Sequence, residues 1–251
     1  MSGHSKWKTI KRKKGAADAK RGAVFTRLTR EIVMAAREGG SDPESNFRLR
    51  LALDKARAEN MPKENIERGI RRGAGEDKEG SIFEQITYEG FAPHGVAVMI
   101  ECVTDNRNRT VSDLRHALTK SGGNLGEVGS VGWQFDRVAY FSFPSSAMNY
   151  DKAFELGIEV AASDVLEDNG TIEVIGPVDA FKEIADHLHA AGVQPDEAGL
   201  RMIPKQEVEL NVEQTVQVMH ALEAVEELDD VQNVFSNLKV SEEALVALEA
   251  A

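Results

Sequence analysis

The stretch DVLEDNGTIEVI, Asp164–Ile175, decides how the second half of the chain is interpreted. Two short segments, 164–166 and 171–175, are typical of strands, and Asp168-Asn169-Gly170 stands between them. An Asn-Gly pair between two such segments is a strong turn signal of β-hairpins. The sequence therefore predicts an antiparallel hairpin at this point.

The segments on both sides of this hairpin complete a known order of elements. The hydrophobic pattern predicts strands at 138–143 and 200–203 and helices at 150–162 and 181–191. The resulting order, β-α-β-β-α-β, is that of the ferredoxin-like fold. Residues 137–204 are therefore expected to form a ferredoxin-like domain.

Strands at 83–88, 96–103 and 131–135 and a helix at 110–120 precede the ferredoxin-like domain. The elements that follow it, strands at 207–210 and 231–235 and a helix at 212–228, are too few to form a domain of their own. Thr110 and Asp113 have the spacing of a capping box at the start of the first of these helices. We therefore expect residues 81–136 and 205–240 to form one discontinuous α+β domain, into which the ferredoxin-like domain is inserted.

Residues 1–75 are expected to form a basic helical domain. The predicted helices are 23–37, 42–60, which Asp42-Pro43 opens, and 62–73. The segment that follows, up to Gly80, has the composition of a linker. The predicted fold class is α+β with three domains. These are an N-terminal helical bundle and two α+β domains, one of which is ferredoxin-like and inserted in the other.

Charge is distributed unevenly along the chain, whose net charge is −12. Residues 1–75 contain 19 Lys and Arg against 9 Asp and Glu, which gives 19 − 9 = +10. The remaining residues contain 30 − 19 = 11 basic and 42 − 9 = 33 acidic side chains, which gives −22. An asymmetry of this size favours a polyanionic partner for the basic segment, and the acidic remainder would be repelled by that partner.

The most basic stretch is the N-terminal arm, residues 1–22. Lys and Arg neutralise phosphates and release counterions, which gives an affinity that depends strongly on salt and little on base sequence. Trp7 lies among lysines and is a candidate to stack on an unpaired base. The alternative interpretation of such a run is a solvated charged surface. The predicted phosphate contacts of residues 1–75 are Lys6, Lys8, Lys11, Arg12, Lys13, Lys14, Lys20, Arg21, Arg27 and Arg30.

A second candidate anchor is the segment Thr104–Thr110, TDNRNRT, between a predicted strand and a predicted helix. Arg107 and Arg109 would hold a phosphate there, at the positive end of the helix. The other interpretation is a capped connector, in which Asp105 or Asn106 supports the turn. The sequence leaves both interpretations open.

Nothing in the sequence favours catalysis. The glycine-rich segment 122–132 follows a helix, whereas phosphate-binding loops follow a strand, so a connector is the better interpretation. The six histidines are scattered, and no motif of a nucleophile with its base or of a zinc site is present. We therefore expect no enzymatic activity, no cofactor, no metal and no small-molecule substrate.

Signals for membranes and export are also lacking. No apolar run approaches the length that crosses a bilayer, and no secretory signal is present at the N-terminus. The single cysteine, Cys102, cannot form an internal disulfide and is expected to be buried. These features predict a cytoplasmic protein without a membrane partner. The acidic segment 144–251, with 5 basic and 23 acidic residues, would suit docking to a basic protein, or it is an ordinary solvated surface.

Motifs that span nearly the whole chain, in order, resemble those of one known family. They are Gly3–Trp7, Asp18–Arg21, Asn60–Lys63, Asn65–Arg68, Tyr88–Gly90, Asp105–Thr110, Gly122–Gly126 and Asp230–Val234. On these residues the chain resembles the YebC/PmpR family of probable transcriptional regulators. That family is related to the mitochondrial translational activator of cytochrome c oxidase subunit I.

The resemblance implies three domains of the kinds predicted above and supplies no catalytic residue. Some members of the family are described as DNA-binding transcriptional regulators, and others act on the ribosome and relieve stalling at proline-rich stretches. The hypothesis from the sequence is therefore a non-enzymatic, nucleic-acid-binding regulator of gene expression, with DNA as its target. The alternative is a ribosome-associated translation factor that binds ribosomal RNA.

Overall fold

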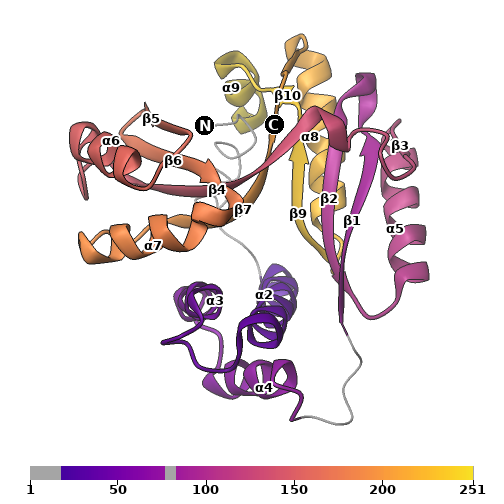
Figure 1. The fold of residues 1–251 in the computed structure, drawn as a ribbon. Helices are drawn as coiled ribbons and strands as arrows, with labels where there is room; N and C mark the ends of the chain where they lie inside the picture. The colour runs from indigo at the N-terminus through magenta and orange to yellow at the C-terminus, as the bar shows by residue number, and fades with distance from the viewer. Residues whose placement is uncertain (1–17, 77–82, 251) are drawn as a thin grey trace. The chain divides into compact units, whose positions relative to one another are not determined.

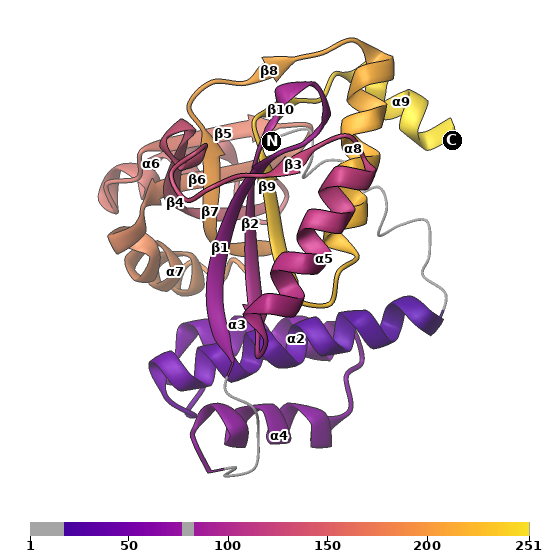
Figure 2. The ribbon, with the colours of Figure 1, turned by 90° about the vertical axis from the view of Figure 1, so that its right-hand side faces the viewer.

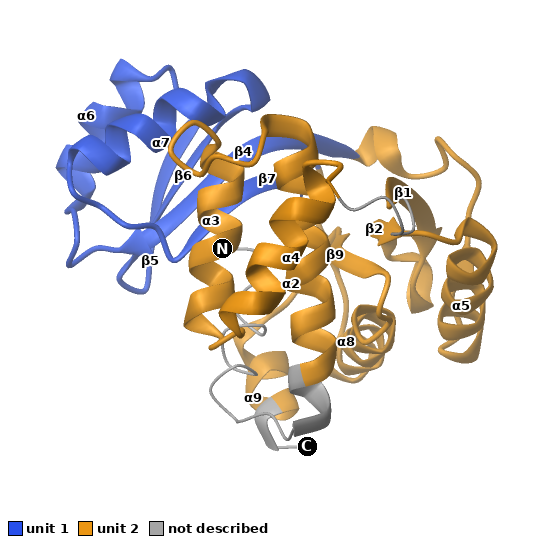
Figure 3. Cartoon of the chain, turned by 90° about the horizontal axis from the view of Figure 1, so that it is seen from below, with its two compact units in different colours: residues 1, 135–205 blue, residues 2–134, 206–251 orange. Residues whose placement is uncertain are grey.

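The computed structural model describes residues 18–76 and 83–250, with side chains for 22–76 and 83–248. These residues fall into two units (Figure 3). Unit 1 comprises residues 135–205, and unit 2 comprises the described residues up to 134 and from 206 onward. Both units combine helices with antiparallel sheets, so the chain is an α+β protein, as the sequence predicts.

Unit 1 is built around the predicted hairpin. β5 (Asp164–Asp168) and β6 (Thr171–Pro177) pair antiparallel. The two turn residues both have positive φ, 50° at Asn169 and 77° at Gly170. A two-residue turn with this backbone follows the natural twist of the paired strands, and Asn and Gly are the residues that adopt it most readily.

Two further strands and two helices complete unit 1 (Figure 1). β4 (Phe135–Pro144) and β7 (Glu197–Pro204) extend the sheet to the order β5-β6-β4-β7, in which all neighbours are antiparallel. α6 (Tyr150–Glu159) follows β4, and α7 (Phe181–Ala190) follows β6 after the short 3₁₀ helix η3 (Val178–Ala180). The order of elements is the predicted β-α-β-β-α-β of the ferredoxin-like fold.

Unit 2 contains a second four-stranded sheet. Its strands are β1 (Glu84–Phe91), β2 (Ala97–Thr104), β3 (Asn124–Leu125) and β9 (Val231–Ser236), in the order β3-β1-β2-β9 with antiparallel neighbours. β2 precedes unit 1 in the sequence and β9 follows it, yet the two strands pair. The segments before and after unit 1 therefore share one sheet.

Two helices cover this sheet. α5 (Arg107–Lys120) and α8 (Val212–Glu226) lie beside it (Figure 2). β2 is buried along its whole length, and Ile100 and Cys102 share a core cluster with side chains of both helices. Burial raises the pKa of the Cys102 thiol to about 12. The cysteine is therefore a protonated core residue, which agrees with the sequence prediction.

The short elements of unit 2 contain the largest departures from the predicted pattern. They are η1 (Pro93–Gly95), η2 (Gly132–Gln134), β8 (Val208–Glu209), β10 (Leu238–Lys239) and α9 (Glu242–Ala250). Of these, only β8 was predicted, and β3 was not predicted either. The predicted strand at 131–135 is wrong, because η2 occupies its centre and β4 begins only at Phe135. Val131 and Phe135 are both buried, but they are separated by a turn rather than by a strand.

Three helices form the N-terminal part of unit 2: α2 (Asp18–Gly39), α3 (Phe47–Ala58) and α4 (Lys63–Gly73). The predicted start of the second helix at Asp42-Pro43 is wrong. The side chain of Asn46 accepts a hydrogen bond from the Leu49 N–H at 3.0 Å and donates one to the Ala35 carbonyl at 2.8 Å. Asn46 therefore caps α3 and also ties it to α2, and the exposed Asp42 does neither.

The glycine-rich segment after β3 wraps around the carboxylate of Glu89. This carboxylate accepts hydrogen bonds from the backbone N–H groups of Gly129 at 2.7 Å, Val131 at 2.8 Å and Gly132 at 2.7 Å. Burial alone would raise the pKa of Glu89, but the three hydrogen bonds outweigh it and lower the pKa. The amides that a phosphate would need are occupied by the chain's own anion, so this segment is a connector, as the sequence predicts.

The hydrogen bonds to Glu89 predict a pH-dependent contribution to stability. The pKa of Glu89 is lower in the folded protein than the ordinary value of 4.5. Its contribution is therefore fully present above pH 4.5 and is lost as the pH falls through the lower, folded-state pKa. We expect Glu89→Gln to reduce the free energy of unfolding by about 1–2 kcal/mol at pH 7, and by less as the pH falls below 4.5.

Urea unfolding of both proteins from pH 3 to pH 7 measures this effect. Glu127→Gln is the matched control, because Glu127 belongs to the same segment but is exposed, and its effect should stay within about 0.5 kcal/mol. A difference between wild type and Glu89→Gln that is the same at every pH would contradict the assignment.

Candidate nucleic-acid interface

Most of the predicted nucleic-acid contacts precede position 22. Lys6, Trp7, Lys8, Lys11, Arg12, Lys13 and Lys14 lie outside the described residues. Lys20 and Arg21 belong to the first turns of α2, but their side chains are outside the described set. The structure therefore bears on the predicted contacts from Arg27 onward.

The arginines of α2 point into unit 2. Arg27 donates a hydrogen bond to the Glu226 carbonyl at 2.7 Å, and Arg30 donates to the Asp229 carbonyl. Arg37 donates to the Phe83 carbonyl at 2.8 Å. Glu226 is the last residue of α8, where backbone carbonyls lack partners within the helix and carry partial negative charge. α2 therefore binds the end of α8 and the loop after it through Arg27 and Arg30.

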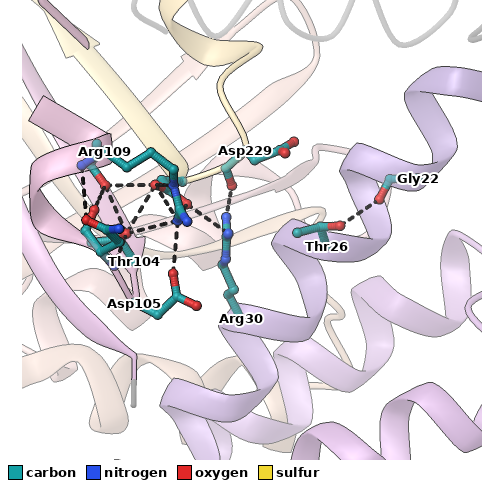
Figure 4. A network of polar contacts seen from close by, with 10 residues as sticks. Gly22, Thr26, Arg30, Thr104, Asp105, Arg109 and Asp229 are labelled. Carbon is teal, nitrogen blue, oxygen red and sulfur yellow. Dashed lines mark hydrogen bonds and ion pairs between the residues drawn. The ribbon is translucent and has the colours of Figure 1, made fainter. Parts of the chain in front are cut away.

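The carboxylate of Asp230 is the centre of this contact, to which α2 contributes Arg30 and α5 contributes Arg109. Figure 4 shows these two arginines in one network of polar contacts. Arg30 Nη2 lies 2.8 Å from Asp230 Oδ1, and Arg109 Nη2 lies 3.0 Å from the same oxygen. The Thr110 hydroxyl donates to Oδ2 at 2.7 Å, and the Thr104 hydroxyl lies 3.1 Å from Oδ2. Asp230 is only 5% exposed and Arg30 only 8%. A buried carboxylate is tolerated when its charge is paired and its oxygens are hydrogen-bonded, and Asp230 meets both conditions.

The prediction that Arg30 contacts phosphate therefore does not fit its position. Its guanidinium is buried and already binds a carboxylate and a carbonyl. The sequence does not reveal this position, because the spacing of charges along a helix does not show which polar side chains are covered by another part of the chain. Arg27, whose guanidinium binds the Glu226 carbonyl, is partly buried in the same contact.

The segment Thr104–Thr110 has the capped-connector arrangement. The predicted capping box is wrong, since Asn106 is the residue that caps α5, with its side chain accepting from the Arg109 N–H at 3.1 Å. Thr110 lies inside the helix, where its hydroxyl binds Asp230 instead. The cap lies earlier than predicted because Asn106 has extended backbone and a short side chain that reaches the free N–H groups.

The two arginines of this segment bind carboxylates of unit 2. Arg107 pairs with Glu84. Arg109 pairs with Asp105 and Asp230, and the hydrogen bond that it donates to Asp230 is the main reason that the pKa of Arg109 is raised. A phosphate at either guanidinium would compete with a carboxylate that is already in place. Their role as a phosphate anchor stays a prediction.

A polar pocket of about 700 Å³ lies next to the Asp230 network, between α2, α4 and the end of the sheet. Its charged lining residues are Arg30, Arg68, Arg72 and Arg109 together with Asp105, Asp113, Glu227, Asp229 and Asp230. The two signs nearly balance. Opposite charges in contact cancel at a distance, so this pocket is not an attractive site for a polyanion.

The described helical part carries little uncompensated charge. Residues 18–75 contain 13 basic and 9 acidic side chains, so 13 − 9 = +4, whereas residues 1–17 contain 6 basic and none acidic, so +6. Several exposed cations of α3 and α4 face acidic neighbours. The pairs are Arg48 with Glu38, Lys55 with Glu31 and Lys63 with Glu67. The net positive charge per residue is therefore greatest in residues 1–17, the part of the arm that precedes α2.

The described residues also bear on the expectations about membranes and metals. None of their helices combines the length and the apolar character that a bilayer-spanning helix needs. In the same residues, His, Cys, Asp and Glu side chains do not gather in groups of three that could bind a metal ion.

Asp230 was missed as a key residue by the sequence analysis. Its partners lie 121 positions away at Arg109 and 230 − 30 = 200 away at Arg30, and no local pattern connects such positions. The available signal was that Asp230 and the Thr104–Thr110 segment both belong to the motifs of the resemblance.

The pairing of Asp230 predicts its effect on stability. Asp230→Asn keeps the size of the side chain but leaves Arg30 buried without its counter-charge. Arg109 is partly exposed, so it loses less than Arg30 does when its partner is removed. We expect the free energy of unfolding to fall by about 2–3 kcal/mol, as measured by urea unfolding at pH 7.

Arg107→Gln is the matched control for Asp230→Asn. It breaks the exposed pair with Glu84 in the same segment, which should change stability by less than about 1 kcal/mol. Similar losses in the two variants would show that Asp230 is not a centre of this contact.

Comparison with known proteins places the whole chain among close relatives. Residues 5–76 match the model of the TACO1/YebC N-terminal domain, and residues 83–238 match that of the TACO1/YebC second and third domain. A probable transcriptional regulatory protein of Geotalea uraniireducens is 51% identical over 245 residues, with 98% of each chain covered. A protein of the same description from Borrelia turicatae is 48% identical, with 97% of this chain and 99% of the relative covered.

A solved structure has the same fold. The crystal structure of a conserved hypothetical protein from Aquifex aeolicus superposes with a TM-score of 0.80 at 43% sequence identity, covering 90% of this chain and 93% of the other. Two family models together match almost all of the chain, and relatives about half identical cover its full length. The chain therefore belongs to the TACO1/YebC family.

Proposed function

We propose that this protein is a regulator of gene expression that binds nucleic acid through the N-terminal arm, with DNA as the target. Its relatives are named probable transcriptional regulatory proteins, which supports a role in transcription. The proposal places the protein in the cytoplasm. It involves no catalytic step, cofactor, metal or small-molecule substrate.

The observation that best supports the proposal is the uneven distribution of basic and acidic residues along the chain. The six basic residues of 1–17 have no acidic neighbour in that segment, while the arginines of α2 are bound within unit 2. A run of cations on a DNA backbone displaces condensed counterions, and the entropy of their release drives binding. The contact is therefore assigned to the arm rather than to the face of α2.

The acidic remainder of the chain sets the orientation of this contact. Residues 76–251 carry 11 basic and 33 acidic side chains, which gives 11 − 33 = −22. A phosphate backbone repels such a surface and attracts the arm. The protein is therefore expected to approach nucleic acid with its N-terminus first.

Deleting residues 2–17 tests the arm while leaving α2 complete. The deletion removes six basic residues. Binding to random duplex DNA is measured over a salt series. The slope of log affinity against log salt should fall in magnitude by up to about 5, because each phosphate contact contributes about 0.9.

Arg48→Gln combined with Lys55→Gln is the matched control. It removes two cations from the same part of the chain that already pair with Glu38 and Glu31, and the slope should change by less than about 1. If the deletion leaves both affinity and slope unchanged, the arm is not the binding element.

A translation factor that binds ribosomal RNA is the second candidate function. It is favoured by the position of Arg27, Arg30 and Arg37, which all bind within unit 2. The part of α2 whose side chains the structure describes, from Gly22 onward, therefore does not offer these three arginines as a recognition helix does in the major groove. A Lys-rich arm that reads phosphates and unpaired bases suits folded RNA. On this alternative the ribosome is the partner.

Trp7 distinguishes the two targets. If the arm meets unpaired RNA, Trp7→Ala should reduce affinity for single-stranded RNA by about tenfold, because stacking of a base on an aromatic ring contributes about 1–3 kcal/mol. Affinity for duplex DNA should not change, since its bases are already stacked. Trp133→Ala is the control, because Trp133 is the second tryptophan and is 70% exposed.

Sedimentation of cell extract through sucrose gives a complementary result. Co-migration with ribosomal subunits at low salt, which the deletion of residues 2–17 abolishes, would favour the translation factor. In the affinity measurements with Trp7→Ala, equal losses of affinity for single-stranded RNA and for duplex DNA would contradict base stacking.

A further inference from the structure

α6 of unit 1 has one apolar face that the unit itself covers. Ala153, Leu156 and Gly157 are buried against the sheet. A Cβ at position 157 would lie 2.6 Å from Val165 Cγ2, so this glycine is what allows the helix to approach β5 so closely. The internal packing of α6 is therefore complete on this side.

A second apolar face of α6 is exposed. Tyr150, Phe154 and Ile158 are 37%, 47% and 67% exposed. They are four residues apart, so they form a continuous row along the helix. The rings of Tyr150 and Phe154 stack with their centroids 6.0 Å apart. Single exposed apolar side chains are ordinary on protein surfaces, but an ordered row of three is a feature of docking sites.

An acidic row runs beside this apolar row. Asp151, Glu155 and Glu159 each follow a member of the apolar row by one position, and all three are exposed. At 100° per residue, the apolar row lies between the buried face and the acidic row. A partner that covers the apolar row therefore meets three carboxylates along its outer edge.

A hollow lies at the start of the apolar row. It has a volume of about 300 Å³ and is lined by Tyr150, Val165, Leu166 and Glu167. Leu166 is 40% exposed, so the hollow offers a further apolar contact. A side chain of the partner could be accommodated there.

The edge of β5 is less suited to a partner strand. β5 borders the sheet and has β6 as its one neighbour. However, the Val165 N–H is bound by the Asp164 side chain at 2.9 Å, and the Tyr150 hydroxyl lies 3.4 Å from the Val165 carbonyl. An added strand would have to displace both groups, so the surface favours a helix that lies along α6.

The net charge of unit 1 indicates which kind of helix would bind along α6. Residues 135–205 contain 5 basic and 13 acidic side chains, so the unit carries 5 − 13 = −8. A nucleic acid would be repelled, and a second copy of the same surface would bring acidic rows together. A helix with lysines or arginines beside its apolar residues is the occupant that matches both rows.

We propose that α6 is the docking site for a basic amphipathic helix of another protein. Its apolar side chains pack on Tyr150, Phe154 and Ile158, and its cations pair with Asp151, Glu155 and Glu159. The inference does not depend on nucleic-acid binding by the arm. It assigns a second partner, of opposite charge, to a different unit of the chain.

A direct test uses two synthetic peptides and the full-length protein. The probe is an 18-residue helical peptide with leucines at i, i+4 spacing and lysines beside them, and the control peptide has the same composition in scrambled order. Binding is measured by fluorescence anisotropy at two salt concentrations. The probe should bind more tightly than the scrambled peptide, and more weakly at high salt.

Two double variants separate the rows. Phe154→Ser with Ile158→Ser should weaken binding of the probe by about tenfold or more, because two apolar contacts are lost. Glu155→Gln with Glu159→Gln should weaken binding and reduce its salt dependence. Val246→Ser is the matched control, because Val246 is 65% exposed on another acidic helix, α9. This variant should bind the probe as tightly as the wild-type protein does. Circular dichroism checks that each variant is folded.

Several results would overturn the proposal. One is equal binding of the probe and the scrambled peptide, and another is wild-type binding in both double variants. A photo-crosslinker at position 158 gives an independent result in cells. Crosslinks to basic amphipathic segments of another protein support the proposal, whereas crosslinks to nucleic acid, to residues 1–22 or to a second copy contradict it.

Discussion

The cost of burying a carboxylate is the constraint that organises unit 2. Asp230 is almost fully enclosed, and a charge in that position is tolerated only with counter-charges and hydrogen bonds. Arg30 comes from α2 and Arg109 from α5, so two distant parts of the chain are held at the end of β9 by one side chain. This use of Arg30 has a consequence for function. Arg30, which the sequence assigns to a phosphate, pairs instead with a carboxylate of the protein itself. For this reason the proposed contact with a polyanion is assigned to the arm.

The chain thereby separates two opposite kinds of surface. The arm is cationic and has little apolar character apart from Trp7 and Ile10, whereas α6 presents an apolar row bordered by carboxylates. Surfaces of opposite sign do not compete for the same partner. On the two proposals made above, the arm would bind nucleic acid while α6 binds a basic protein.

Local patterns predict much of this fold, and long-range pairings account for the rest. The hairpin at Asn169-Gly170 and the order of elements in unit 1 follow from turn chemistry and periodicity, which act between near neighbours. The starts of α3 and α5 were misplaced because several Asn, Asp and Thr residues compete to cap each helix. Asn46 caps α3 because its side chain also forms a hydrogen bond with the Ala35 carbonyl in another helix. Thr110 does not cap α5, because its hydroxyl forms a hydrogen bond with Asp230 instead. The burial of Arg30 was invisible for the same reason, since its partner is remote in sequence. The arm of the candidate site can be read from the sequence because its charge is a local property.

The pairing of β2 with β9 has a consequence for how the protein is made. Ile100 and its partner Val234 are 234 − 100 = 134 positions apart. At ordinary rates of translation, β2 is synthesised roughly 10 s or more before β9. During this time the whole of residues 135–205 is synthesised and can fold. During that interval a strand that is wholly buried in the finished protein has an open edge on the growing chain, which is a hazard for aggregation. The carboxylate at position 230 is synthesised at the same late stage, so the Arg30 guanidinium gains its counter-charge only when the sheet closes. In unit 1, by contrast, the first and last strands pair directly at Phe135 and Pro204, which allows the inserted segment to close on itself before the chain around it is complete.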